Sequence, residues 1–283
     1  MRDVARRGLA VGFFDGVHLG HQAILGSASA ALTFANHPLS LLAPERAPRL
    51  IMSAADRVAA IRACGVGDVA VLDFTRGLSD MPAEEFAEMH LRRAARDGVV
   101  HCGDNWRFGH GGRGDANMLR RMGFAVEVVP YATYGGERIS STRIRAALES
   151  GKVEDANAML GREWFLRGKV VRGKGLGSRI GYPTVNVIPE DLRLDLRRGV
   201  YEVAAFGARA LANYGIAPTC GDRAWSAPVL ELHFAGHAPD CSEGDAALVS
   251  FRRFIRPEMK FGSLDDLKSQ IARDVCVLTD VMI

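Results

Sequence analysis

Short apolar runs alternate with segments of helical spacing through the first half of the chain. An apolar run over residues 9–14 precedes a glycine-bearing loop and a helical stretch from Gln22. Further runs and helical segments follow in turn, over residues 31–34, 54–63, 69–74, 82–95, 99–102 and 125–129. In the segment 82–95, Phe86, Met89 and His90 recur at helical spacing. This alternation favours a doubly wound parallel sheet, whose ligands bind at the carboxyl ends of its strands.

The pattern changes in the second half. Residues 142–160 are predicted to be helical with a break near Gly151, and short strand-like runs follow over 165–171, 199–206, 209–214, 228–234 and 246–254. Short strands separated by Gly, Pro and Asp are typical of an antiparallel barrel or sandwich. One amphipathic helix closes the chain, with Ser263 as its expected N-cap. We therefore expect an α/β domain over residues 1–160 and a β domain with a terminal helix over 161–283.

Composition narrows the choice of functions. The chain has 283 residues and a formal net charge of +3, too small for an extended nucleic-acid surface. Its apolar runs are shorter than the roughly 20 residues of a membrane span, so neither nucleic acid nor a membrane is an expected partner. The five cysteines form no C-x-x-C pair. They are expected to be reduced thiols in a cytoplasmic protein.

A first candidate site lies in the segment 12–22, which reads GFFDGVHLGHQ. Here a strand meets a helix N-terminus, whose free N–H groups and positive dipole end suit a phosphate. Two imidazoles in one turn can donate hydrogen bonds as negative charge develops. The alternative is that the histidines only cap a helix. We expect a nucleotide phosphate to bind at Phe14, Asp15, Gly16, His18, Gly20 and His21.

Two later segments strengthen this prediction. ISSTRIR over residues 139–145 opens a helix with three hydroxyls and two arginines, and its hydroxyls and backbone N–H groups are expected to form a second anion cradle that includes Ser141, Thr142 and Arg143. The alternative interpretation of this segment is a well-capped surface helix with no ligand. The loop 103–109, GDNWRFG, can close over a flat ring, or can be simply an exposed glycine-rich loop. His37, after the strand at 31–34, is a weaker candidate.

A second candidate site lies in the β half. Four glycines with Lys174 and Arg179 suggest a loop that wraps phosphates, although it lacks the order of a P-loop. Thr184 and Asn186 alternate on an extended segment, so their oxygens face the same way and could hold a hydrated Mg²⁺. Glu231, between apolar strand neighbours, could take a proton from a hydroxyl, or could be a solvent-facing strand residue.

Together these motifs resemble the bifunctional bacterial riboflavin kinase/FAD synthetase family. The resemblance covers nearly the whole chain in order. In the first half it rests on GFFDGVHLGHQ, TFANHP, GDNWRFGHGGRGD and ISSTRIR; in the second, on GKGLGSRIGYPTVN, RRGVYEV, NYGIAPT, LELHF and FIRPEMKFGSLDDLKSQIARD. H-x-G-H with S-S-T-x-I-R marks a wider nucleotidylyltransferase superfamily. P-T-x-N followed by E-x-H is more specific to flavokinases.

The resemblance implies two reactions with ATP as co-substrate and Mg²⁺ as cofactor. The N-terminal nucleotidylyltransferase domain adenylylates FMN to FAD, and the barrel phosphorylates riboflavin to FMN. It implies His18, His21 and Glu231 as catalytic residues, and Thr184 and Asn186 as metal ligands. The implied flavin contacts are His37, Asn105, Trp106, Arg107 and Phe108 in the first domain, and Tyr201, Asn213, Arg256 and Phe261 in the second. The implied kinase ATP contacts are Gly173, Gly175, Gly177, Arg179, Gly181, Pro183, Thr184 and Asn186.

The sequence departs from the family in places. The stretch between His21 and Thr33 is short for a parallel crossover, which normally needs about a dozen residues or more. Asn36 replaces a usual proline, and Asn105-Trp106 replaces Asp-Phe. In the kinase half, Val185 replaces a usual alanine and Ala217 a usual arginine. The short first crossover leaves a monofunctional riboflavin kinase with a weak N-terminal domain as the alternative. A transferase for another phosphate ester, with the barrel as a binding module, is a third hypothesis. Riboflavin, FMN and ATP are the expected small-molecule partners. The protein is expected to be a monomer or a homo-oligomer.

Overall fold

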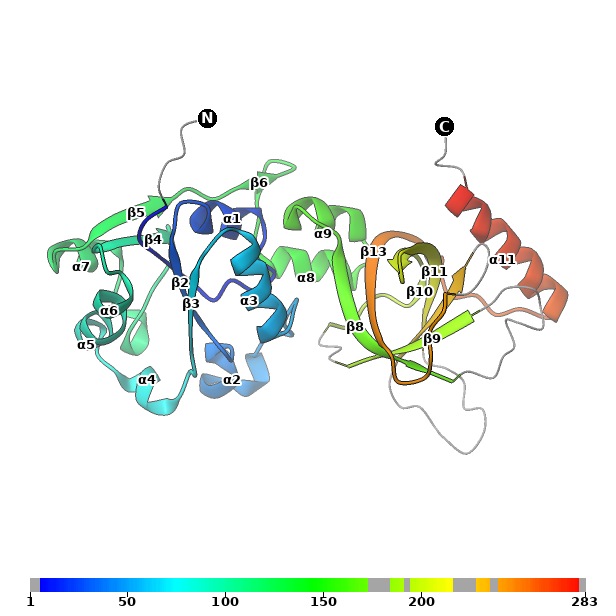
Figure 1. The fold of residues 1–283 in the computed structure, drawn as a ribbon, viewed down its shortest axis with the longest axis horizontal. Coiled ribbons are helices and arrows are strands. Elements are labelled where there is room, and N and C mark those ends of the chain that lie inside the picture. The colour runs from blue at the N-terminus through cyan, green and yellow to red at the C-terminus, as the bar shows by residue number, and fades with distance from the viewer. Residues whose placement is uncertain (1–5, 173–183, 191–193, 216–227, 235–238, 280–283) are drawn as a thin grey trace. The chain divides into compact units, whose positions relative to one another are not determined.

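The computed structural model describes residues 6–172, 184–190, 194–215, 228–234 and 239–279. The chain divides into two compact units, Met1–Ile144 and Arg145–Ile283. Each unit is treated by itself below (Figure 1). The division between the two units, after Ile144, lies within the helix Ser141–Glu149. The domain boundary after residue 160, expected from the sequence, stays a prediction.

The first unit is built on a parallel sheet in the order β3-β2-β1-β4-β5, as the alternating pattern predicts. Its strands are β1 (Leu9–Val11), β2 (Ala30–Phe34), β3 (Asp68–Leu72), β4 (Val99–Gly103) and β5 (Ala125–Val129). The chain winds outward in one direction from β1 to β3 and in the other from β4 to β5. The topological switch point, where ligands bind in such sheets, therefore lies between β1 and β4.

Short helices and one hairpin connect these strands. The helices are α1 (Leu19–Leu25), α2 (Pro38–Leu42), α3 (Ala54–Ala63), α4 (Arg76–Asp80), α5 (Ala83–Phe86), α6 (Arg92–Ala94) and α7 (Ala116–Arg121). The hairpin pairs β6 (Thr133–Tyr134) with β7 (Glu137–Arg138), and α8 (Ser141–Glu149) and α9 (Val153–Leu160) follow it. The first crossover is short, yet β1 and β2 pair in parallel, with Leu9 opposite Ala30.

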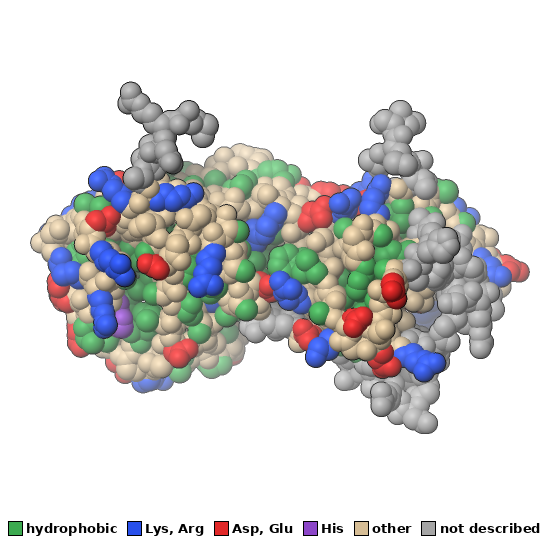
Figure 2. All heavy atoms as spheres, viewed as in Figure 1, with side chains coloured by type: hydrophobic (Ala, Val, Ile, Leu, Met, Phe, Trp, Pro, Cys, Tyr) green, Lys and Arg blue, Asp and Glu red, His purple; other side chains and the backbone are tan. Residues whose placement is uncertain are grey.

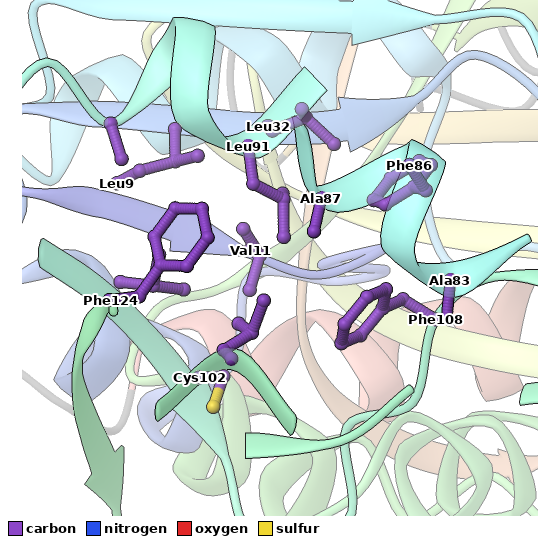
Figure 3. Close-up of a cluster of buried hydrophobic side chains, with 13 residues drawn as sticks. Leu9, Val11, Leu32, Ala83, Phe86, Ala87, Leu91, Cys102, Phe108 and Phe124 are labelled. Atoms are coloured by element: carbon purple, nitrogen blue, oxygen red, sulfur yellow. The ribbon is translucent and has the colours of Figure 1, made fainter. Parts of the chain in front are cut away.

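Alternation along β1 divides the core of the first unit between the two faces of the sheet. Leu9 and Val11 pack with Phe86, Leu91 and other apolar side chains on one face (Figure 3). Ala10 joins a separate cluster on the other face. Both faces are thus covered, which is what a parallel sheet requires. The central strand is consequently a rigid base for the loop that follows it.

The second unit is a closed barrel, the first of the two β architectures that the sequence favours. Its described strands run in the order β10-β11-β12-β9-β8-β13. They are β8 (Trp164–Val171), β9 (Thr184–Pro189), β10 (Gly199–Ala205), β11 (Ala208–Gly215), β12 (Val229–Phe234) and β13 (Ala246–Pro257), followed by helix α11 (Leu264–Thr279). Ser263 Oγ accepts from the Asp266 N–H at 3.1 Å, which confirms the predicted N-cap.

The barrel strands alternate between an apolar interior and an outer face. Tyr201, Leu232 and Phe251 are fully buried. On the outside, α11 packs over a small cluster in which Leu278 meets Leu211. Polar side chains on the outer face that α11 leaves uncovered are therefore available for chemistry.

Charges of both signs are interspersed on the surface drawn in Figure 2. Within the described residues, no helix is long and apolar enough to span a membrane. The four described cysteines, Cys64, Cys102, Cys241 and Cys276, are free thiols.

Arg57 on α3 fixes the carboxyl end of β2. Its side chain is fully buried and donates to the carbonyls of Phe34 and Ala35. Its guanidinium also lies 4.2 Å from the centre of the Phe13 ring. One buried cation thereby ties together the segments that follow β1 and β2.

The substitution Arg57→Met is expected to destabilise the first unit by about 2–3 kcal/mol, because two partly buried carbonyls lose a charged donor. Urea unfolding measures the loss, and hydrogen exchange of β1 and β2 peptides assigns it to the first unit. Arg62→Met, at an exposed position of the same helix, is the matched control. Equal stabilities of the two variants would contradict the role given to Arg57.

Candidate active sites

The loop between β1 and α1 has an unusual backbone. Phe14 and Val17 have φ angles of 57° and 40°, and Gly16 has a φ of 83°. Residues other than glycine rarely adopt such angles, and a β-branched residue such as valine does so least readily. Each costs about 1–3 kcal/mol and persists only where its surroundings enforce it. Because such backbone strain is concentrated at functional sites in proteins, this loop is a candidate part of an active site.

Buried contacts hold the strained loop in place. Phe14 and Val17 are each 1% exposed, so their side chains are anchored in the core. The buried carboxylate of Asp15 accepts from the Ile51 N–H at 3.0 and 3.2 Å. Gln22 Nε2 donates to the Val17 carbonyl at 2.9 Å. Asp15, a predicted nucleotide contact, thus binds the backbone of Ile51, and its role at a nucleotide stays a prediction.

The loop presents two stacked histidines at the start of α1. His18 is the N-cap, and its Nδ1 accepts from the His21 N–H at 3.3 Å. The two rings stack with centroids 3.6 Å apart. A Cβ on Gly20 would lie 3.3 Å from the His18 ring, so glycine leaves room for this stack. His18 therefore caps the helix, as the structural alternative predicts, and also faces the cavity described next.

A cavity of about 600 Å³ opens at the predicted edge of the sheet. It lies at the carboxyl ends of β1, β4 and β5, at the switch point. The predicted site residues on its wall are Phe14, His18, Gly20, His21, Asn105, Trp106, Arg107, Ser141 and Thr142. Asp15, Gly16, His37, Phe108 and Arg143 are not part of the wall. Two segments that are distant in sequence, 12–21 and 138–142, thus meet around one space.

The N-terminus of α8 forms the second side of this cavity. Ser140 Oγ caps it by accepting from the Arg143 N–H at 3.2 Å. Ser141 Oγ donates to the Asp15 carbonyl at 2.8 Å, which joins the helix to the strained loop. The Arg143 guanidinium instead donates to the Glu137 carbonyl at 3.0 Å. The N-termini of two helices, α1 and α8, therefore lie on the wall of the same cavity, an arrangement that suits phosphates.

Arg138 is a wall residue that the sequence analysis missed. Its guanidinium lies 3.0 Å from Asp104 and 3.1 Å from Asn105 Oδ1. Arg138 thus lines the cavity as a guanidinium paired with Asp104, which is also on the wall. The sequence feature that could have indicated Arg138 is its position directly before the ISST motif. The strand that contains it has two residues, too few to show a hydrophobic pattern.

A second, apolar cavity of about 250 Å³ adjoins the first and shares Val11, Gly12, Trp106 and Arg107 with it. Its aromatic walls are Phe34, Phe74, Phe86, Trp106 and Phe108. The Trp106 and Phe108 rings stack at 4.8 Å. A flat aromatic ligand fits such walls. His37 lies outside the lining; it caps α2 and contacts the Phe13 ring edge-on at 4.8 Å.

In the barrel, predicted residues from four strands align in one row. Val200 of β10 pairs with Arg256 on one side and Asn213 on the other. Asn213 pairs with Glu231, and Glu231 with Asn186. Directly paired residues lie on the same face of a sheet, with Cβ atoms about 5 Å apart. The row therefore brings together an amide, a carboxylate and a second amide on the outer face of the barrel.

The next row adds His233 opposite Thr184. Thr184 and Asn186 line a cavity of about 400 Å³ with Arg172, Cys241 and Glu243. Burial lowers the pKa of His233, although the carboxylates of Glu231 and Asp274 act in the opposite direction. Polar oxygens from β9 and a carboxylate from β12 thus lie side by side. The described residues contain no group of three or more His, Cys, Asp or Glu side chains that could hold a metal.

The other predicted flavin residues of the barrel, Tyr201, Arg256 and Phe261, contact side chains within the second unit. Tyr201 is fully buried in the interior, where its ring packs against Phe251 and Phe254. Its neighbour Val200 occupies the outer row, so alternation points Tyr201 inward. Arg256 forms an ion pair with Asp274 of α11 at 2.7 Å, and its guanidinium lies 6.0 Å from the Phe261 ring. Tyr201 is therefore a core residue, and its contact with a flavin stays a prediction.

The predicted phosphate loop lies outside the described residues. This holds for Gly173, Gly175, Gly177, Arg179, Gly181 and Pro183.

A parallel sheet with two helix N-termini at its switch point, followed by a barrel with an outer polar row, has the architecture of a nucleotidylyltransferase joined to a flavokinase. Comparison with known protein families gives the same two domains in the same order. A family model described as FAD synthetase matches residues 2–143, and one described as riboflavin kinase matches residues 160–282. The chain belongs to the bifunctional riboflavin kinase/FAD synthetase family.

Several relatives resemble it over most of their length. The bifunctional riboflavin kinase/FMN adenylyltransferase of Escherichia coli K12 is 35% identical, over 94% of this chain and 90% of that protein. The protein of that name from Listeria monocytogenes is 31% identical, over 94% and 89%. A solved structure described as a macrolide-efflux protein from Streptococcus pneumoniae has a TM-score of 0.83 at 27% identity, over 98% of this chain and 94% of that one. The last likeness concerns the fold, and efflux is said only of that protein.

The ring of His21 is expected to titrate below the ordinary histidine value. Burial lowers its pKa well below 6.5, and the neighbouring His18 adds to this effect. Since the folded state then binds the proton less readily than the unfolded state, His21 does not affect stability well above pH 6.5 and weakens folding as the pH falls below it. An NMR titration, with the signal assigned by its loss in His21→Gln, measures the midpoint. A midpoint at or above 6.5 would contradict this account.

Proposed function

We propose that the chain makes both flavin cofactors in sequence. The barrel transfers the γ-phosphoryl group of ATP to riboflavin, giving FMN and ADP. The first unit then joins AMP from a second ATP to FMN, giving FAD and pyrophosphate. The observation that carries the proposal is that each unit has its own polar site, the cradle of two helix N-termini in one and the outer row in the other. The names of the relatives support the same two reactions.

In the first unit, the FMN phosphate attacks the α-phosphorus of ATP and pyrophosphate leaves. The cradle at His18, His21, Ser141 and Thr142 supports binding of the ATP phosphates, because N–H groups and imidazoles stabilise the charge that develops. The adjoining apolar cavity, with Trp106 and Phe108, supports binding of the flavin ring. Asp15 and Arg143 then act by positioning the cradle through backbone contacts.

In the barrel, Glu231 accepts the proton of the riboflavin hydroxyl as the hydroxyl oxygen attacks the γ-phosphorus. Asn213 and Asn186 flank this carboxylate in the row. The neutral oxygens of Thr184 and Asn186 suit Mg²⁺, which prefers oxygen ligands and keeps several waters. When bound, Mg²⁺ neutralises charge on the ATP phosphates. Flavin contacts at Asn213, Arg256 and Phe261 belong to this proposal, as do the predicted ATP contacts in 173–183.

The alternative of a monofunctional kinase rests on the short first crossover. That crossover nevertheless completes a parallel β1–β2 pair, and the loop within it holds His18 and His21 at a cavity. The bifunctional proposal is therefore favoured. Free thiols and a mixed surface charge support a cytoplasmic protein that acts on small molecules.

The substitution His18→Asn tests the adenylyltransferase site. Asparagine is a good N-cap, so it preserves the start of α1 while removing the imidazole. FAD formation from supplied FMN is expected to fall by about 100-fold or more. Phosphorylation of riboflavin by the same preparation serves as the internal control and should be unchanged. FAD formation at the original rate would exclude a role for the imidazole.

The substitution Glu231→Gln tests the kinase site. It keeps the shape of the side chain and removes the base, so FMN formation should fall by about 100-fold or more. FAD formation from supplied FMN should remain. Both rates are measured by separating the flavins after incubation with ATP and Mg²⁺. Loss of both activities would show that Glu231 supports the fold, and loss of neither would show that the base lies elsewhere.

A further inference from the structure

His233 lies beside Glu231 but has no part in the steps above. The two residues are two apart on β12, so their side chains share the outer face of the barrel. His233 Nε2 lies 3.9 Å from Glu231 Oε2. The Glu231 side chain is 38% exposed, whereas that of His233 is 11% exposed. The carboxylate is thus open to a substrate, and the imidazole beside it is covered.

The surroundings of His233 fix its ring. Its cross-strand partners are Leu211 on β11 and Thr184 on β9. Asp274 of α11, close enough to influence the imidazole electrostatically, is itself held by Arg256. His233 Nδ1 is buried and has no hydrogen-bond partner among the described residues. Packing rather than a hydrogen bond at Nδ1 therefore sets the ring orientation, with Nε2 on the side of Glu231.

We propose that His233 is a positioning residue for the phosphorylation of riboflavin. Once the substrate hydroxyl is bound, His233 Nε2–H donates to the Glu231 carboxylate and holds it where it accepts the hydroxyl proton. The present separation of 3.9 Å is too long for a hydrogen bond, and catalytic hydrogen bonds commonly shorten in the substrate complex. The substrate proton goes to Glu231, and His233 keeps its own. This inference rests on the proposed kinase reaction.

The test replaces His233 in the full-length protein and measures both activities. His233→Phe fills the space of the imidazole without an N–H, and His233→Leu removes the N–H with less volume. Either is expected to lower kcat for FMN formation by about 100-fold, because a displaced base is costly. The KM for riboflavin should stay within about threefold, since binding groups are unchanged. His233→Gln, which restores a donor, should recover kcat to within about tenfold of the original protein.

Three controls separate the outcomes. FAD formation from supplied FMN reports on the other unit and should not change. Lys169→Gln, at an exposed position of β8 paired with Glu190, should leave kcat unchanged. In a Glu231→Gln background, His233→Phe or →Leu should cause no further loss, because the two residues act as a unit.

An unchanged kcat in a folded His233→Phe or His233→Leu variant would overturn the inference. The same conclusion follows if His233→Gln loses as much kcat as His233→Phe, or if the effect is confined to KM. If the original protein forms no FMN at all, the proposed kinase function fails instead. The two failures are therefore distinguishable in one set of assays.

Discussion

The strained turn after β1 is the constraint on which the first site depends. Phe14 and Val17 hold positive φ angles only because their side chains are buried and because Asp15 is fixed to Ile51. This turn aims α1 at the carboxyl edge of the sheet. It also supplies the carbonyl of Asp15 to which Ser141 binds, so it sets the position of the second helix as well. One local backbone conformation thus brings two helix N-termini to a single cavity.

The barrel reaches a similar result by different means. Its proposed site residues lie on the strands themselves, and the register of the strands rather than a loop brings them together. Asn186, Asn213 and Glu231 become neighbours because each pairs directly with the next strand. The closed interior supports this row from beneath, since Leu230 and Leu232 on either side of Glu231 are fully buried. A one-residue slip of β12 would exchange the carboxylate for an apolar side chain.

Local patterns predicted much of this structure. Hydrophobic spacing predicted the parallel sheet, most of its strands and the amphipathic terminal helix. Sequence motifs singled out four residues that line the first cavity: His18, His21, Ser141 and Thr142. Long-range pairing could not be predicted in the same way. Arg138 lies in a two-residue strand, and the apolar cavity uses Phe74 and Leu78 near the short helix α4, where no period is visible.

Local geometry explains the positions of two further side chains, Met89 and Tyr201. The segment 82–95 contains a π-helical turn at Ala87–Leu91, which shifts the helical face. Met89, expected beside Phe86, is therefore 52% exposed, and Leu91 is buried instead. Tyr201 follows a residue of the outer row, so the two-residue period of a strand turns it into the core. A motif identifies which residue type occupies a position, whereas the two-residue period of the strand determines whether its side chain faces the barrel interior or the outer surface.

The central claim is that one chain transfers two different phosphorus atoms of ATP to a flavin, one in each unit. Supplying riboflavin with ATP labelled at either the γ- or the α-phosphorus tests it most directly. The account predicts that FMN carries only the γ label, while FAD carries both labels in equal amounts. The α label in FMN, or FAD without the α label, would contradict it.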